Sequence, residues 1–306
     1  MSHQPYAIEI GGSILSAISR QSVSSTNQIS SDVHAGSPYP QCVTINGQKN
    51  QADFSTEDIE TAIDLVGTAG LAIGASPVKV WQLELDDETG LPKSGSDHRL
   101  LTIPRGKVIP QRLSCEHQGN ATLDLMAHAL WDPSSPTDPP ITSAETQALP
   151  TGLAGDSRWT IAAVKVAGQD LPCALRFDLD FGIRIESEGC NSDIHDRTLI
   201  VTEIKPVVTI SGKNVKSFLS TVIPLKGAAA THANTEIYLR RRLTTEAGFD
   251  PVATTSHIKI TADGLATWER VHDTQNNRRI ENGLRIDCRH DGTNVPVVIT
   301  TGVALT

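Results

Sequence analysis

The sequence predicts an all-β protein made of two tandem copies of a β-sandwich or half-barrel domain, each with one flanking α-helix. Hydrophobic residues are 38 % of the 306 residues but aromatic residues only 4 %, a balance that suits strands and turns more than packed helices. Several segments alternate apolar and polar residues with the period of a strand. Short segments of the first half return in the second, and the length is about twice the commonest domain size.

The clearest recurrence is the heptad Leu-Ser-Cys-Glu-His-Gln-Gly at residues 113–119, which returns as Ile-Asp-Cys-Arg-His-Asp-Gly at residues 286–292. Residues 85–92 parallel residues 243–251 at a shift of 158, and residues 54–59 parallel 210–215 at a shift of 156. The heptad shift is 173, so about fifteen extra residues (173 minus 158) are expected in the polar stretch 270–282. Two diverged copies of one domain explain these parallels. The alternative is that short strand-forming segments resemble one another by accident.

We expect residues 1–131 and 156–306 to form the two domains, joined by a Pro- and Ser-rich linker without periodicity at residues 132–155. The formal net charge of −9 is uneven. Residues 1–155 hold 8 Lys or Arg and 17 Asp or Glu, which leaves 18 of each (26 minus 8, 35 minus 17) for residues 156–306. An acidic first half argues against a nucleic-acid-binding protein, because phosphate contacts need clustered cations.

The N-terminus lacks the basic and apolar regions of a signal peptide, and no window approaches the roughly 18 apolar residues of a membrane span. We therefore expect neither export by a signal peptide nor a membrane-spanning segment. Five cysteines, an odd number, argue against a disulfide framework and fit folding in a reducing cytoplasm.

In the first half, residues 6–10 alternate and predict a strand. Residues 22–40 are polar and rich in turn-forming residues, which predicts a long loop or an extended hairpin, followed by a short strand at 41–45. Further strands are expected at residues 78–85, 99–103, 108–115 and 121–130.

A helix is predicted at residues 55–66, with Ser55 as its N-cap and with Phe54 and Ile59 as a hydrophobic staple. Its apolar stripe has helical spacing and is expected to pack on a sheet; it consists of Ile59, Ala62, Ile63 and Val66. The second half repeats this pattern at residues 211–222, with Ser211 as cap and Ile210 and Val215 as staple.

The clearest strand is at residues 174–186, where apolar and charged side chains alternate over a length of roughly 40 Å. Such a strand is typical of a large barrel wall or a shared sheet, and it carries neither proline nor a run of like charge. We expect its edge to pair with another subunit. The residues predicted for this inter-subunit sheet are Leu175, Phe177, Leu179, Phe181, Ile183 and Ile185.

The sequence contains no nucleophile elbow, P-loop, dinucleotide-binding turn or zinc-protease helix, so we expect no catalytic site and no cofactor. The pairs Cys115/His117 and Cys288/His290 could ligate zinc. They lie in different predicted domains, and we expect buried cysteines with a histidine at the strand end instead of a metal site. The acidic run at residues 86–88 is expected to be a solvated turn.

Two groups of arginines could grip phosphate, but their surroundings are not basic overall. Strand alternation also sends the middle residue of the first group to the opposite face. We expect these arginines to meet acidic surfaces of another subunit and to take part in ring stacking or other inter-subunit contacts; they are Arg240, Arg241, Arg242, Arg278 and Arg279.

This order of elements, present twice and without a catalytic motif, resembles the tail tube proteins of long-tailed (siphovirus-like) bacteriophages. The segments that carry the resemblance are residues 31–66, 192–222 and the closing strands at 113–130 and 284–305. Single-domain members of that family stack as hexameric rings, whereas tandem-domain members form trimeric rings with pseudo-sixfold walls. The chain resembles the tandem type, although residues 14–23 lack the clean alternation of residues 175–185 and the linker is long.

The resemblance implies a structural protein of the virion tail that is assembled in the host cytoplasm. Copies of the chain would form stacked rings around a channel through which DNA passes without specific binding. Tape-measure, tail terminator and baseplate proteins would be its other partners.

Three alternatives remain. A baseplate hub or distal tail protein uses the same fold. A tandem β-sandwich module that binds glycans or host receptors would expose aromatic side chains on loops, and the chain has only twelve aromatic residues. A metal-dependent enzyme would be revealed by elemental analysis of the purified protein.

Overall fold

The computed structural model describes residues 3–33, 35–36, 38–95, 97–135, 137–151, 153, 157–190, 193–213, 223, 231–242, 248–270 and 282–305. Strands make up 62 % of the structure and helix 3 %, which confirms the predicted all-β class.

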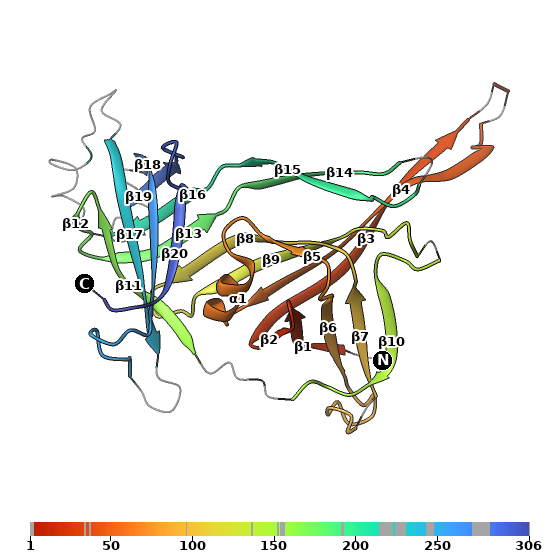
Figure 1. The fold of residues 1–306 in the computed structure, drawn as a ribbon, viewed down its shortest axis with the longest axis horizontal. Helices are drawn as coiled ribbons and strands as arrows, with labels where there is room; N and C mark the ends of the chain where they lie inside the picture. The colour runs from red at the N-terminus through yellow and green to blue at the C-terminus, as the bar shows by residue number, and fades with distance from the viewer. Residues whose placement is uncertain are drawn as a thin grey trace.

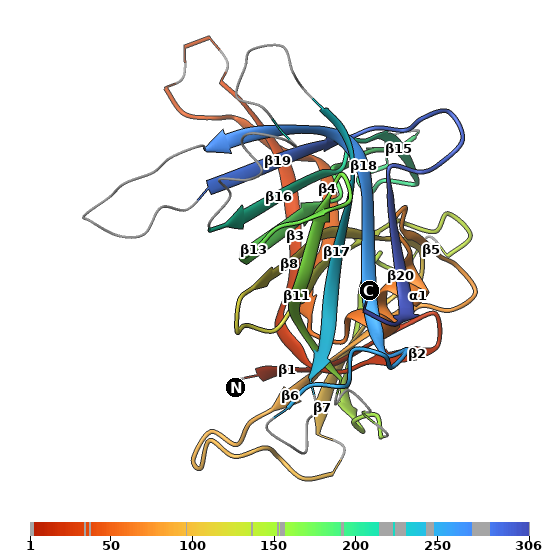
Figure 2. The same ribbon diagram turned by 90° about the vertical axis from the view of Figure 1, so that its left-hand side faces the viewer.

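Thirteen strands form one large antiparallel sheet that includes strands from both halves of the chain (Figures 1 and 2). Along its main path the order is β12 (Gln169–Asp170), β11 (Arg158–Val166), β17 (Thr231–Arg242), β18 (His257–Arg270), β19 (Asn282–Cys288), β16 (Val207–Gly212), β13 (Ala174–Asp180), β8 (Gly106–Glu116), β9 (Thr122–Ala129), β4 (Cys42–Thr56) and β3 (Ile18–Asp32). Beside this path, β20 (Val297–Val303) pairs with β18 and β5 (Leu71–Ile73) pairs with β8.

Two smaller sheets accompany the large one. Five strands lie in the order β10 (Thr142–Gln147), β7 (His98–Ile103), β6 (Val78–Glu84), β1 (His3–Ile10) and β2 (Ser13–Leu15). The strands β14 (Ile183–Glu188) and β15 (Thr198–Ile204) pair only with each other among the described strands.

The hydrophobic core lies between one face of the large sheet and the elements that cover it. Phe54 and Phe177 come from the large sheet, Val80 from the five-stranded sheet and Ile59 from the helix, and all four are at most 1 % exposed. They belong to one cluster, so the two halves share a core. The helix also touches the second half directly, because Thr301 in β20 donates a hydrogen bond to Asp64 (3.0 Å).

The helix α1 (Ile59–Val66) confirms the predicted apolar stripe, since Ile59, Ala62, Ile63 and Val66 are all buried. The predicted N-cap and staple are wrong. Ser55 and Phe54 lie in β4, and Asp58 occupies the N-cap position without a side-chain capping bond. The helix does not begin at Ser55 because β4 continues to pair with both β3 and β9 as far as Thr56.

The second predicted helix is wrong at its start, because Ile210 and Ser211 lie in β16 and pair with β13 and β19. Ser211 is therefore a strand residue and not a helix cap. Val215 and most of the predicted helix lie outside the described residues.

The strand predicted at residues 174–186 is divided in two by Phe181 and Gly182. Gly182 has a positive φ of 57°, and a Cβ at this position would overlap the carbonyl oxygen of Lys205. The chain therefore leaves the large sheet at Gly182 and continues as β14. Within the predicted apolar face, Phe177, Leu179 and Phe181 are buried.

Two polar segments form more regular structure than expected. Residues 22–32 belong to the 15-residue strand β3, and β4 is equally long, so the extended hairpin is confirmed and the loop is wrong. Within the predicted linker, residues 142–147 form β10, which pairs with β7. The other predicted strands of the first half are confirmed as β1, β6, β7, β8 and β9.

Candidate assembly interface

Two groups of four strands follow each other in the large sheet and have the same internal order. The first block is β3, β4, β9 and β8, and the second block is β13, β16, β19 and β18. In both blocks every neighbouring pair is antiparallel. The last strand of the first block is bonded to the first strand of the second.

The register of the two blocks is the same. Ile18 pairs with Thr56 in the first block and Ala174 pairs with Gly212 in the second, so both strands are displaced by 156 residues (174 minus 18, 212 minus 56). A β-bulge follows each of these pairs at the same position. Bulges are specific local features, so their recurrence supports an equivalence of the two blocks.

A second bulge also recurs. The pairing of β8 with β9 is interrupted between Pro110 and Arg112, and that of β18 with β19 between Trp268 and Arg270, a displacement of 158 (268 minus 110). The sequence shifts of 156 and 158 therefore match the sheet. The heptad shift of 173 does not match the sheet. Residues 113–116 end β8, the fourth strand of the first block, whereas residues 286–288 end β19, the third strand of the second block and the counterpart of β9.

The junction between the blocks is a regular antiparallel pairing of β8 with β13. It runs from Glu116 opposite Arg176 to Arg112 opposite Asp180. At its two ends His117 N donates to Leu175 O (2.6 Å) and Phe181 N donates to Gln111 O (3.0 Å). Figure 2 shows β19, β16, β13 and β8 following one another without a break.

This junction occupies the edge of β13, which corrects the prediction of a free edge at residues 174–186. Residues 176–180 pair with β8 of the same chain, and the side chains of Phe177, Leu179 and Phe181 fill its core. Leu175, at the start of β13, is half-buried, as are Ile183 and Ile185 in β14. The six predicted inter-subunit residues thus contribute to contacts within one chain.

The edge that is free belongs to β3. Among the described strands β3 pairs only with β4, and it ends the large sheet. Over 15 residues it carries one arginine and one aspartate and no proline or lysine. Long edges without such features are available for pairing with another chain.

Each block includes a hairpin that extends beyond it, and the two hairpins also share a register. Ile29 pairs with Ile45 in the first hairpin (β3 and β4), and Ile185 pairs with Val201 in the second hairpin (β14 and β15), again 156 residues later. A bulge precedes both pairs. Two residues further along, Val43 of the first hairpin corresponds to Leu199 of the second.

The corresponding side chains differ in exposure. In the second hairpin Ile185, Leu199 and Val201 are half-buried. In the first hairpin Ile29 is 62 %, Val43 64 % and Ile45 49 % exposed. The first hairpin projects from the body of the molecule, whereas the second runs along the first block (Figure 1).

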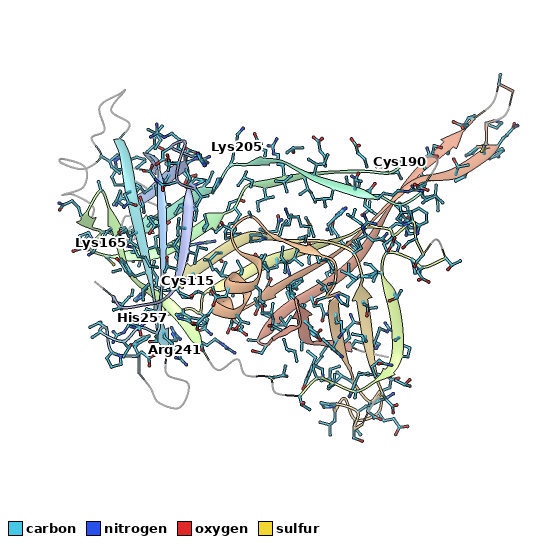
Figure 3. All side chains as sticks on the ribbon, viewed as in Figure 1. Cys115, Lys165, Cys190, Lys205, Arg241 and His257 are labelled. Carbon is cyan, nitrogen blue, oxygen red and sulfur yellow. The ribbon has the colours of Figure 1, made fainter. Side chains whose placement is uncertain are left out.

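The second hairpin is held on the first block near its tip. Gln48 N donates to Ile194 O (2.7 Å), and Trp131 N donates to Asp196 O (2.9 Å). The guanidinium group of Arg197 lies 4.9 Å from the centre of the Trp131 ring. His128 Nε2 is 3.8 Å from an Asp196 carboxylate oxygen, and burial lowers the pKa of His128 although Asp196 opposes this shift. In Figure 3 Lys205 and Cys190 mark the two ends of this hairpin.

The polar face of the large sheet carries charges that are paired with each other. Arg112 forms an ion pair with Asp178, and Arg176 lies 3.2 Å from Glu116. Glu116, Arg176 and Asp178 belong to a polar hollow of about 640 Å³ that extends over both blocks. Its other lining residues are His117, Leu175, Thr209, Ser211, Lys213, Glu269, Asn282 and Gly283. An arginine paired in this way offers less attraction to phosphate.

The three arginines at the end of β17 contact residues of their own chain. Arg240 donates to Asp250 O (2.8 Å), and Arg242 donates to Gln118 O (2.7 Å). Both guanidinium groups lie over the ring of Phe249, at 5.2 and 5.8 Å from its centre. Arg241 instead lies 3.8 Å from the Asp250 carboxylate. Arg278 and Arg279 lie outside the described residues.

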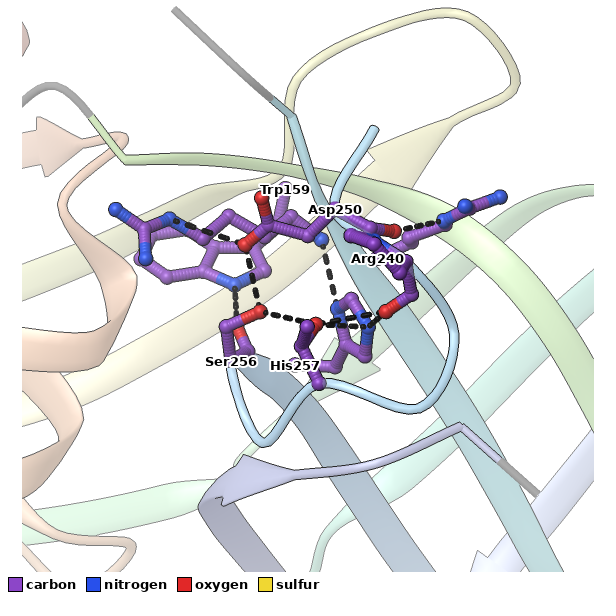
Figure 4. A network of polar contacts seen from close by, with 8 residues as sticks. Trp159, Arg240, Asp250, Ser256 and His257 are labelled. Atoms are coloured by element: carbon purple, nitrogen blue, oxygen red, sulfur yellow. Dashed lines mark hydrogen bonds and ion pairs between the residues drawn. The ribbon is translucent and has the colours of Figure 1, made fainter. Parts of the chain in front are cut away.

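A polar network that no sequence motif marks fixes the loop beside these arginines (Figure 4). Ser256 donates to the Asp250 carboxylate (2.6 Å), and Trp159 Nε1 donates to Ser256 O (3.3 Å). Buried His257 accepts the Arg241 N–H at Nδ1 (3.2 Å), so Nε2 carries the proton and donates to Pro251 O (3.0 Å). No local signal in the sequence marks this network, because its members are brought together by strand pairing.

The described residues contain no group of three or more His, Cys, Asp or Glu side chains placed to hold a metal ion. Burial raises the pKa of the Cys115 thiol. Burial, with smaller effects of Asp287 and Asp263, raises the pKa of Cys288 to about 12. Both thiols therefore stay protonated near neutral pH in the metal-free chain.

A scan against models of known protein families finds no match for the chain, and a search of curated proteins finds none either. Within the part of the chain that the structure describes, no helix has the length and apolar character needed to cross a membrane.

Proposed function

We propose that this protein is the structural subunit of a phage tail tube of the tandem-domain type. The observation that carries the proposal is the junction between β8 and β13, where two blocks of like register join edge to edge. The β3 edge, which corresponds to the joined edge of β13, is free in the described sheet. Because the free edge of β3 is equivalent to the edge of β13 that pairs with β8, the same junction is expected to form between chains.

The matching edge of the second block is the end of β18 at residues 267–270, because β17 already pairs with residues 258–266 of that strand. Repetition of the junction at this edge by rotation would give a closed ring. Each chain brings two blocks, so three chains supply six blocks and a ring with threefold symmetry looks sixfold. Rings that contact each other head to tail then build an open tube. We expect tape-measure, tail terminator and baseplate proteins to bind the tube ends and the channel, in a virion tail assembled in the host cytoplasm.

The polar face of the joined blocks would line the channel. Its arginines are paired with carboxylates, as in Arg112 with Asp178 and Arg176 with Glu116. A wall whose arginines are paired in this way would let DNA pass without holding it, since binding to DNA is dominated by unpaired cations that meet phosphates. This role requires neither a catalytic site nor a cofactor.

A proline on the free edge tests the proposal. Ser25 takes the position of Phe181 (181 minus 156), whose N–H donates to Gln111 O across the junction. By this correspondence the Ser25 N–H points to the free edge, where Ser25→Pro removes a donor without breaking the bonds to β4. Ser25→Val is the matched control, because it also removes the hydroxyl but keeps the N–H.

We expect the wild type and Ser25→Val to form rings and tubes by negative-stain electron microscopy, and Ser25→Pro to stay monomeric with an unchanged circular dichroism spectrum. A wild-type protein that remains monomeric at high concentration would refute the proposal. Rings of six whole chains would refute the threefold arrangement. Rings that never stack would instead favour a baseplate hub or distal tail protein.

A further inference from the structure

We propose that the first hairpin of each chain lies across the second block of the neighbouring chain, with its apolar face, formed by Ile29, Val43 and Ile45, covered by that neighbour. The inference rests on the proposed ring and identifies a contact within it. Its basis is the difference in exposure between two hairpins of equal register.

The second hairpin supplies the template for this contact. Its residues Ile185, Leu199 and Val201 occupy the same register positions as the apolar face of the first hairpin, yet they are half-buried. Near its tip it is bonded to the first block through Ile194 and Gln48. In the second hairpin, the apolar face is therefore partly covered where the hairpin lies on the first block, which is the neighbour of its own block.

The first hairpin has no block of its own chain beside it, because β3 ends the described large sheet. Its apolar face is 49–64 % exposed on a two-stranded ribbon. Such a ribbon is marginally stable in water unless a further element covers its apolar side. The next block in the ring is the second block of another copy.

The template also identifies the residues that meet. Gln48 corresponds to Ile204 by strand register (204 minus 48). Ile194 corresponds to Pro38 by its position in the hairpin loop, since the loops at residues 33–41 and 189–197 have the same length (194 minus 38). The bond from Gln48 N to Ile194 O then becomes a bond from Ile204 N of one chain to Pro38 O of the next. A proline can fill this role because the bond needs only its carbonyl oxygen. Ile204 is 43 % exposed in the single chain, which leaves it accessible to a neighbour.

A cysteine cross-link tests this contact in a background in which Cys42, Cys173 and Cys190, the exposed cysteines, are replaced by serine. With Pro38→Cys and Ile204→Cys in one chain, mild oxidation of assembled protein should give dimers and trimers on a non-reducing gel. With Gln48→Cys and Ile194→Cys, the same treatment should give a cross-link within one chain and no oligomers. The second pair controls for oxidation itself.

A charge on the apolar face provides an independent measurement. Val43→Asp should raise the protein concentration needed for ring formation roughly tenfold or more, because an unpaired charge would be buried in the contact. Thr44→Asp places the same charge on the opposite face of the hairpin and should assemble almost as wild type. Since Val43 is exposed in the single chain, the melting temperature of the monomer should not change.

The outcomes separate this inference from the proposed function. Rings that form without the cross-link between positions 38 and 204, or that tolerate Val43→Asp as well as Thr44→Asp, would overturn the hairpin contact and leave the ring intact. A symmetric cross-link between two hairpins that carry only Pro38→Cys would also overturn it. Absence of any ring in the wild type would overturn both.

Discussion

Gly182 is the residue at which the chain leaves the large sheet and enters the second hairpin, and Gly182→Ala should therefore be strongly destabilising. The positive φ of 57° costs a residue with a Cβ roughly 1–2 kcal/mol. The new Cβ would also overlap Lys205 O, and relief of such overpacking costs typically about 1–3 kcal/mol. We expect the free energy of unfolding to fall by about 2–5 kcal/mol, the sum of the two effects.

Gly168→Ala separates these two contributions. Gly168 also has a positive φ, of 76°, but a Cβ there would meet nothing within 4 Å. This control should lose only the roughly 1–2 kcal/mol that the backbone conformation costs. Urea unfolding followed by tryptophan fluorescence measures both values. Equal losses for the two variants would refute the steric argument, and no loss for Gly182→Ala would refute the sharp departure of β14 from the sheet.

Burial and local bonding lead to three further predictions. Ile59→Ala empties a fully buried position under the large sheet and should lower the free energy of unfolding by about 2–4 kcal/mol in the same urea assay. Under native conditions at pH 8, Cys115 and Cys288 should react with iodoacetamide far more slowly than the exposed cysteines Cys42, Cys173 and Cys190, as mass spectrometry would show, and elemental analysis should find no stoichiometric zinc. Hydrogen bonds from Asn294 and Thr293 lower the pKa of Asp291 from 3.8 to about 2, so the loop bonds should stabilise the fold above pH 3.8 and be lost as the pH falls toward 2, which NMR titration of the carboxyl group would detect. Fast labelling of Cys288, or an Asp291 that titrates near 3.8, would contradict the corresponding contacts.

Local periodicity predicted the helix α1 and the strands β1, β6, β7, β8, β9 and β13, because it reports which side of an element is buried. The helical spacing of Ile59, Ala62, Ile63 and Val66 identified the only helix among the described residues, and alternation identified β13. Periodicity does not report what an element pairs with. Ser55 has the chemistry of a helix cap, but its place between β3 and β9 makes it a strand residue.

The longest strands were the hardest to predict. Residues 22–32 are rich in serine, threonine and asparagine, and their side chains are mostly exposed on both faces of a projecting ribbon, so no apolar alternation marks them. β10 is missed for the same reason, since nearly all of its residues are exposed at the edge of the five-stranded sheet. Strands of this kind are set by pairing with a neighbour, which a single segment of sequence does not encode.

The candidate interface could be predicted from the sequence only in part. The shift of 156 between residues 54–59 and 210–215 is the true displacement of the paired strands, whereas the more similar heptads are not equivalent. A strand end followed by a glycine turn recurs easily by chance, but a bulge at the same place in two hairpins does not.

The repeat also changes how the inter-subunit contact can be inferred. A single-domain subunit does not contain an example of the junction that it forms with its neighbours. This chain contains one, between β8 and β13, together with one hairpin lying on a block. The differences between the two blocks then become informative. Leu199 of the second hairpin is half-buried whereas Val43 of the first is exposed, and in the proposed ring the missing cover is the surface that a neighbouring copy would supply.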